Sequence, residues 1–353
     1  MNLDDLERFK RLDPAGMLEQ IDGLPGQLAQ AWELGQELPL PDMAGVRQVL
    51  IAGMGGSAIG ADLVLAYASP LANLPMTVWR DYGLPAYVQG PDTLVIASSH
   101  SGDTEETLSA FAEAEVRGAR RLALTTGGEL AARAGNGGAL LWTFEHRGQP
   151  RAAVGFSFGL LLAALARMGG LPDPRTEVLQ AVEAMRVQQP ALRAETPVVK
   201  NLAKRMAGQF MDRWPVVLAA DLLAPVARRW RTQVSELAKA VAQFEQLPEA
   251  DHNLVAGVEN PEKLFERTLA VFLRSTFNDP RNARRLEATR QIMMVSGFNT
   301  DLLEAPGPSR LAQQWTSLHL GDYIAYYLAM AYGVDPTPVM AIEDLKLRLS
   351  EAG

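Results

Sequence analysis

The sequence predicts an α/β protein with two domains, each a parallel sheet flanked by helices, and a helical C-terminal segment. The chain has 353 residues, 48% of them hydrophobic, which is enough for two ordinary domain cores. Aromatic residues make up 7%, whereas Ala, Leu and Val are abundant, a composition that favours helices layered on a sheet. Short β-branched runs alternate with helical patterns along the first half, and this alternation is typical of a parallel sheet.

Helical patterns separate several of the strands predicted in the first half. The clearest is Thr104–Arg117, and an apolar helix at Ala153–Met168 follows the last strand. A Gly-Gly pair ends at residue 170 and a Leu-Pro-Asp-Pro turn follows it, so we expect domains at 1–170 and 171–353. The predicted strands are Val46–Ala52, Met76–Trp79, Thr93–Ala97, Arg121–Thr125 and Leu140–Phe144.

The second half is more helical but repeats the same theme. Three further strands are predicted at Val216–Ala220, near Leu269–Arg274 and at Asn299–Leu303. The longest helical pattern ends at Gly333, a residue that suits the left-handed position after a helix. The helical patterns cover Thr176–Gln188, Pro197–Met211, Ala224–Phe244, about Ser309–Tyr332 and Val339–Leu349.

Composition excludes several classes of function. The formal net charge is −8 and no run of Lys or Arg interrupts this acidity, so nucleic acid is not an expected partner. The lack of cysteine excludes disulfides and thiolate chemistry and suits a reducing compartment. The longest charge-free apolar stretch, Ala152–Ala166, spans 15 residues, short of the ~20 that a membrane helix needs. With a charged N-terminus that lacks a signal-peptide core, we expect a cytoplasmic protein that contacts no membrane.

The strongest local motif is VLIAGMGGSAIGADL at residues 49–63, where a strand runs through a glycine-rich loop into a helix. Gly53, Gly55 and Gly56 let the backbone approach an anion, and Ser57 and the amides of the helix N-terminus offer donors to it. No Gly-Lys-Ser/Thr follows, which excludes a P-loop. A tight turn that packs the helix against the strand is the plainer interpretation of the same residues.

The same loop also satisfies the relaxed dinucleotide fingerprint, as Gly53-x-Gly55-x-x-Ala58. Asp81 ends the next strand roughly where a ribose-binding acid would lie. An NAD-dependent oxidoreductase is therefore one alternative function.

A cluster of hydroxyls follows the strand Thr93–Ala97, in SSHSGDTEE at residues 98–106. Four hydroxyls and a glycine fall within seven residues, at another strand end that opens a helix. Hydroxyls and helix-terminal amides together can bind several oxygens of one phosphate monoester, whereas a dinucleotide site does not require such a cluster. Helix capping, with Ser101 as N-cap and Glu105 or Glu106 in the first turn, accounts for only one of these hydroxyls.

The two motifs together, GMGGSAIGADL and SSHSGDTEETL, resemble the SIS (sugar isomerase) fold. Downstream, the chain resembles the bifunctional phosphoglucose/phosphomannose isomerases of that superfamily, in the same order and over nearly the whole length. The segments that carry this resemblance are QPRAAVGFSFG (149–159), RRWRTQVSELAKAVA (228–242), ADHNLVAG (250–257) and LGDYIAYYLAMAYGVDPTPVMAIEDLK (320–346).

This resemblance implies two SIS-like domains with the active site in the cleft between them, and a homodimer. The implied reaction is reversible isomerisation between glucose 6-phosphate and fructose 6-phosphate, with mannose 6-phosphate also accepted. Proton transfer through an enediolate requires no redox cofactor and no metal, and none of the four histidines has metal-ligand spacing. The implied phosphate-binding residues are Gly56, Ser57, Ser99, Ser101 and Thr104.

The resemblance also implies catalytic roles for residues downstream. Glu236 is the base that moves a proton between C1 and C2, and His252 opens the sugar ring. Arg151 steadies the enediolate, and Lys346 assists at the ring oxygen. Thr337, in the Asp-Pro-Thr-Pro turn, is expected to contribute to the tolerance of mannose 6-phosphate.

The chain departs from the family pattern at two places. Ser235 and Leu237 flank Glu236 where we expect Asn on both sides, and His100 stands where the phosphate loop often has Tyr. These departures leave the base in place but bear on sugar preference. A non-catalytic sugar-phosphate sensor is the second alternative function, and the presence of all four implied catalytic residues argues against it.

The residues themselves also allow plainer roles. Glu236 lies with Gln233 and Arg229 on one flank of an apolar stripe, where a glutamate is often simply solvated. His252 follows Pro248 in a loop, and Arg151 could anchor the next helix by an ion pair. The stripe is predicted to consist of Val226, Trp230, Val234, Leu237 and Val241.

Lys346 falls inside the apolar arc of the last predicted helix, which Val339, Ile342, Leu345 and Leu349 form. We expect this helix to pack over the cleft and to deliver the ammonium to the sugar. In the plainer alternative the stem of Lys346 follows the core and its ammonium reaches water.

Overall fold

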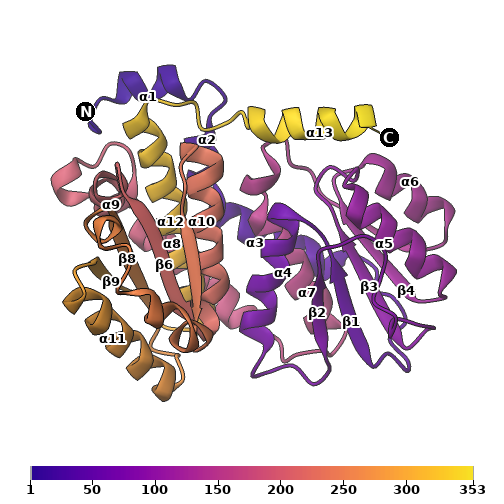
Figure 1. Cartoon of the computed structure of the whole chain (residues 1–353). Helices are drawn as coiled ribbons and strands as arrows, with labels where there is room; N and C mark the ends of the chain where they lie inside the picture. The colour runs from indigo at the N-terminus through magenta and orange to yellow at the C-terminus, as the bar shows by residue number, and fades with distance from the viewer. Residues whose placement is uncertain (1, 353) are drawn as a thin grey trace.

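The computed structural model describes residues 2–352 and contains two parallel sheets with helices packed against them (Figure 1). The first sheet has the order β2-β1-β3-β4-β5 and the second the order β7-β6-β8-β9. All strand pairs are parallel, so the α/β fold class is confirmed. The strands are β1 (Gln48–Ala52), β2 (Met76–Trp79), β3 (Thr93–Ser98), β4 (Arg120–Thr125), β5 (Leu140–Thr143), β6 (Trp214–Ala220), β7 (Gln243–Leu247), β8 (Thr268–Arg274) and β9 (Asn299–Glu304).

Helices make up most of the remaining chain. The α-helices are α1 (Leu6–Leu12), α2 (Met17–Asp22), α3 (Leu24–Glu37), α4 (Gly55–Ala68), α5 (Glu105–Val116), α6 (Gly128–Asn136), α7 (Val154–Arg167), α8 (Arg175–Leu192), α9 (Leu202–Phe210), α10 (Ala224–Ala238), α11 (Pro280–Val295), α12 (Arg310–Tyr332) and α13 (Met340–Ala352). Two short 3-10 helices matter for the site, η1 (Pro150–Ala152) and η4 (Glu249–His252). In residues 2–352, no helix combines the length and the apolar character that crossing a membrane requires.

The first sheet reverses its direction of growth between β1 and β3. The chain leaves β1 for β2 on one side and leaves β3 for β4 on the other. Open α/β sheets place ligands at the carboxyl ends of strands at such a point. The glycine loop after β1 and the hydroxyl loop after β3 both lie there, because each directly follows its strand.

Helices α10 and α12 form the centre of the molecule, beside the second sheet, and α10 also contacts α4 of the first half (Figure 1). Trp230 of α10 donates its indole N–H to the carbonyl of Ser317 on α12 at 2.9 Å. The helices approach closely because Gly321 has no side chain: a Cβ atom there would lie 2.0 Å from the Trp230 nitrogen. This packing fixes the position of every side chain that α10 presents.

The helix predicted at Ala224–Phe244 is wrong at its C-terminal end. Helix α10 ends at Ala238, where Lys239 adopts a left-handed conformation with φ +55°, and strand β7 follows. Val226, Trp230, Val234 and Leu237 are buried as predicted, but Val241 lies beyond the helix and is 68% exposed. The sequence offered no glycine to mark this helix end.

The N-terminal segment lies on the side of the molecule formed by the second half of the chain (Figure 1). Helix α1 packs on α12, where the Phe9 ring lies 6.0 Å from those of Tyr326 and Tyr327. One cluster of buried residues also extends through both halves of the chain. Residues 1–170 hold the first sheet and 171–353 the second, and we keep this division into two domains as a proposal.

Candidate active site

The glycine loop lies directly against the segment that carries Arg151. A Cβ atom on Gly56 would lie 2.7 Å from the carbonyl oxygen of Pro150 and 3.3 Å from the Cα of Arg151. A side chain at position 56 would therefore separate the first turn of α4 from η1. Ser57 is buried in the same turn, and its amide donates to the carbonyl of Met54 at 3.1 Å. No side chain caps this helix N-terminus, so the amides of Gly55 and Gly56 are the ones that an anion could use.

The hydroxyl loop joins the glycine loop at the same edge of the sheet. Ser99 is buried, and its hydroxyl lies 2.9 Å from that of Thr104 and accepts from the amide of Gly102 at 3.1 Å. Ser101 is exposed and accepts from the amide of Asp103 at 3.2 Å. Helix α5 begins at Glu105, so Thr104 is the N-cap residue, and the alternative of Ser101 as N-cap is wrong. Hydroxyls and helix-terminal amides thus lie together in this loop, and groups of both kinds bind the oxygens of a phosphate.

Two histidines connect the hydroxyl loop to the segment before Arg151. Nε2 of His100 lies 3.0 Å from Nδ1 of His146, and the two rings meet edge to face. Burial, with a smaller effect of His146, lowers the pKa of His100 to about 4, and burial also lowers the pKa of His146. Both rings are therefore neutral at pH 7, and one shared N–H holds the two strand-end loops together.

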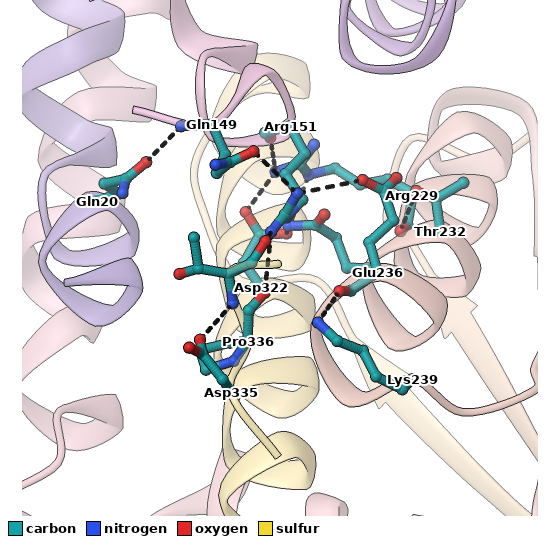
Figure 2. Close-up of polar contacts among 12 residues, drawn as sticks. Gln20, Gln149, Arg151, Arg229, Thr232, Glu236, Lys239, Asp322, Asp335 and Pro336 are labelled. Atoms are coloured by element: carbon teal, nitrogen blue, oxygen red, sulfur yellow. Dashed lines mark hydrogen bonds and ion pairs between the residues drawn. The ribbon is translucent and has the colours of Figure 1, made fainter. Parts of the chain in front are cut away.

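Arg151 is a charged residue that is almost fully buried, with 4% of its surface exposed. Its guanidinium donates to the carbonyl oxygens of Pro336, at 2.9 Å, and Thr337. These bonds hold the residue 335–337 turn against η1 (Figure 2). Arg151 therefore connects the first half of the chain to the end of α12.

Glu236 points at Arg151 from the last turn of α10 (Figure 2). One carboxylate oxygen of Glu236 lies 3.7 Å from Nη1 of Arg151. Burial raises the pKa of Glu236 above its ordinary value, and the Arg151 charge opposes this shift. A carboxylate with a raised pKa, half-buried beside a fixed cation, suits removal of a proton next to a carbonyl.

A buried ion pair between α10 and α12 supports the position of Glu236 beside Arg151. Arg229 donates to both oxygens of Asp322, at 3.0 and 2.7 Å, and to the carbonyl of Arg151 at 3.1 Å. Gln233 donates to the same carboxylate at 3.1 Å. Arg229, Gln233 and Glu236 share one face of α10, so the pair fixes the face that presents the base. Arg229 and Gln233 stand out in the sequence, but Asp322 does not, because it is a lone carboxylate in a long buried helix.

Buried polar atoms without a partner gather around Arg151. Among the described residues, Nε of Arg151, Oε1 of Gln233 and Oγ1 of Thr337 are buried and make no hydrogen bond within the chain. Buried polar atoms are normally hydrogen-bonded, and several orphaned atoms together indicate a position for a polar ligand or ordered water. Thr337 lies beside Arg151, because its carbonyl oxygen accepts from the guanidinium.

His252 is not brought to this site within one chain. It is exposed, on η4, and follows the carboxyl end of β7, which pairs with the carboxyl end of β6. Helix α10 begins at that same edge and runs back, so Glu236 lies about 18 Å along the helix axis from Ala224. Glu236 and His252 therefore lie at opposite edges of the second sheet.

Lys346 is also outside the site in this structure. Helix α13 extends across the first half of the molecule, and its residues are exposed from Met340 to Glu351 (Figure 1). Lys346 makes no ion pair or hydrogen bond with any described residue. The apolar residues of α13 are exposed too, including Leu345 at 55%, so the arc expected to pack against the core is unpartnered here.

The described residues offer few candidates for binding a metal ion or a dinucleotide. Residues 2–352 contain no group of three His, Asp or Glu side chains placed to hold a metal ion. Asp81, the candidate for a ribose contact, is exposed, and its carboxylate accepts from the amide of Tyr82 at 2.8 Å.

Known proteins resemble this chain over most of its length. The bacterial phospho-glucose isomerase C-terminal SIS domain family matches residues 199–349. A bifunctional phosphoglucose/phosphomannose isomerase of Caldicellulosiruptor bescii is 38% identical, over 95% of this chain and 99% of that protein. The one from Aquifex aeolicus is 33% identical, over 88% of this chain and 92% of the relative.

Solved structures share the fold at lower identity. A glucose-6-phosphate isomerase like protein from Thermus thermophilus superposes with a TM-score of 0.63 at 21% identity, covering 96% of this chain and 98% of its own. A glucosamine-6-phosphate deaminase from Thermotoga maritima gives 0.65 at 15% identity, covering 91% and 96%. By its sequence similarity to the curated relatives, the chain belongs to the bifunctional phosphoglucose/phosphomannose isomerase family.

Proposed function

We propose that this protein catalyses the reversible isomerisation of glucose 6-phosphate and fructose 6-phosphate and also accepts mannose 6-phosphate. The observation that carries the proposal is the Glu236 carboxylate held 3.7 Å from the buried Arg151, beside two anion-binding loops. Family membership favours this reaction over the oxidoreductase alternative. The coexistence of a base and an anion-stabilising cation favours it over a sensor.

In this proposal each part of the site has one task. The phosphate binds to the hydroxyls of Ser99, Ser101 and Thr104 and to the amides near Gly56 and Ser57. This anchors the open-chain sugar with C1 and C2 near Glu236.

Proton transfer between the two carbons is then the central step. The Glu236 carboxylate takes the proton from C2 of the aldose, and the electron pair moves into an enediolate. The charge on the enediolate oxygens is met by Arg151, which is already in place and desolvated. A proton moves from O2 to O1 of the enediolate and Glu236 returns its proton to C1, which gives the ketose, and the reverse sequence gives the aldose. Thr337 is proposed to influence which C2 epimer forms.

We also propose that the protein is a homodimer in the cytoplasm. His252 lies too far from Glu236 to act in its own chain but is exposed, so it can reach the site of a second copy. Lys346 is proposed to act at the ring oxygen after α13 closes over the bound sugar. His252 of a second copy and Lys346 would then supply the ring-opening residues, which a single chain does not bring to the site in this structure.

A coupled assay tests the proposed activity. Purified protein with fructose 6-phosphate is expected to form glucose 6-phosphate and mannose 6-phosphate, measured with separate coupling enzymes. The same turnover is expected in the presence of EDTA. Absence of both products overturns the proposal, and loss on chelation that metal restores overturns the metal-free mechanism.

A further inference from the structure

A cavity of about 620 Å³ opens beside the C-terminal end of α10, at the amino edge of the second sheet. Its walls come from the start of β6, the turn after α10, the residues before β8 and the end of α12. None of the residues proposed for phosphate binding or proton transfer lines it. Its size lies in the range of cavities that bind small organic molecules.

The walls of this cavity carry an excess of positive charge. Arg213, Lys239 and Arg267 line it, and Asp212 is the one carboxylate among the lining residues. Within residues 2–352, none of these three cations forms an ion pair. In a protein with a formal charge of −8, three unpaired cations around one cavity indicate a ligand that is an anion.

The same cavity exposes aromatic and apolar side chains. Trp214 is 43% exposed and Tyr332 38%, and both line it with Val241 and Leu264. A flat indole beside guanidinium groups suits a planar ring attached to a phosphate, because the ring can stack while Arg binds the oxygens in a fork. A bare inorganic anion would leave this apolar wall in water.

Lys239 connects the cavity to the active site. It lines the cavity, and its ammonium donates to the backbone carbonyl of Glu236 at 2.7 Å (Figure 2). Partial burial, together with the charge of Arg151, lowers the pKa of Lys239 to about 8. An anion in the cavity would stabilise the charged form of Lys239 and draw its ammonium away from the last turn of α10.

We propose that this cavity is an effector site for an organic phosphate that carries an aromatic base, such as a nucleoside monophosphate. Its binding is independent of the proposed isomerase function, whereas its effect on turnover rests on that function. Occupation of the site changes the hydrogen bond between Lys239 and the Glu236 carbonyl, and thereby changes the position of the Glu236 side chain that acts as the base.

Calorimetry with AMP as the probe tests the binding. The wild-type protein is expected to bind AMP saturably, and inorganic phosphate more weakly. The double substitution Arg213→Gln with Arg267→Gln should weaken AMP binding at least tenfold and leave kcat/KM without AMP unchanged. Trp214→Ala should weaken the binding of AMP but not of phosphate. Arg281→Gln, an exposed arginine on α11, is the matched control and should change nothing.

Enzyme kinetics, and the mass of the protein in solution as a measure of its oligomeric state, complete the test. In the wild type, AMP is expected to change kcat or KM for fructose 6-phosphate without competing for its site, and the double variant should not respond. Three binding or kinetic results overturn the proposal: no AMP binding, AMP binding that survives the double substitution, or simple competition with the sugar phosphate. A change in oligomeric state caused by the double substitution also overturns it, since the cavity would then be a contact between copies. AMP binding in a protein without isomerase activity would leave the site standing and remove only the proposed function.

Discussion

Arg151 and Glu236 lie in different halves of the chain, yet the guanidinium of one lies 3.7 Å from the carboxylate of the other. Burial raises the pKa of Glu236, and the Arg151 charge holds that rise in check. A general base must be ionised, so kcat/KM should fall as the pH drops through this raised pKa.

Arg151→Met tests this coupling. Loss of the cation lets the pKa of Glu236 rise further, so the acid limb of the kcat/KM profile should move to higher pH. Arg151→Lys keeps the charge and should leave the limb near its wild-type position, although its different shape lowers the rate. Profiles of kcat/KM measured from about pH 4 to pH 8 show whether the acid limb moves. An unmoved limb in Arg151→Met would show that Glu236 is not the group that titrates.

Phosphate recognition should depend on the hydroxyl loop. Ser101→Ala combined with Thr104→Ala removes two donors to a dianion, each contributing roughly 1.5–3 kcal/mol, so KM should rise more than tenfold. Thr143→Ala, an exposed hydroxyl at the end of β5, is the control and should leave KM unchanged. Circular dichroism should show an intact fold in both. If the double variant keeps the wild-type KM, the phosphate binds elsewhere.

The sequence predicted those parts of the molecule that local patterns determine. Strand β2 has the predicted bounds, and β3, β4 and β5 differ by one residue at one end, because β-branched runs between turns mark strands clearly. Strand β7 was missed, since QFEQL has little β-branched character and follows α10 without a glycine or proline. The two loops proposed to bind phosphate stand out in the sequence because their glycines and hydroxyls are contiguous along the chain.

Contacts between distant segments could not be predicted in the same way. No pattern relates Arg151 to the carbonyl of Thr337, or Arg229 to Asp322, since both pairs depend on how α10 and α12 pack. The helix around Lys346 shows the opposite case. Its apolar arc was predicted to be buried, but the described chain offers α13 no surface to cover it. Amphipathic character indicates that a helix has a partner, not where that partner lies.

His252 should act across the dimer. Glu236→Gln and His252→Ala should each be inactive alone, but a mixture of the two, dissociated and reassociated, should recover about a quarter of the wild-type activity. Half of the random dimers then contain one site with both residues intact. If either variant is mixed with a His252→Ala, Glu236→Gln double variant, no activity should return. A mixture of the two single variants that stays inactive while mass measurement shows mixed dimers would exclude His252 from the partner's site.

Lys346 should matter only through its charge. Lys346→Met keeps the length of the stem and should lower kcat/KM about tenfold or more, the equivalent of ~1.4 kcal/mol of transition-state stabilisation. The melting temperature should not change, because the residue is exposed. Arg348→Met on the same helix is the control and should keep full activity. A fully active Lys346→Met enzyme would remove α13 from the mechanism.

The most direct test of the whole account is the turnover of Glu236→Gln. Glutamine keeps the shape of the side chain and its place beside Arg151 but cannot accept the proton. Positioned acid–base groups contribute typically ~10²–10⁴-fold, so kcat should fall at least about 100-fold, with fructose 6-phosphate binding, measured by calorimetry, near the wild-type value. A variant that binds the sugar phosphate and keeps more than about a tenth of the wild-type kcat would contradict the account and assign the base to another carboxylate.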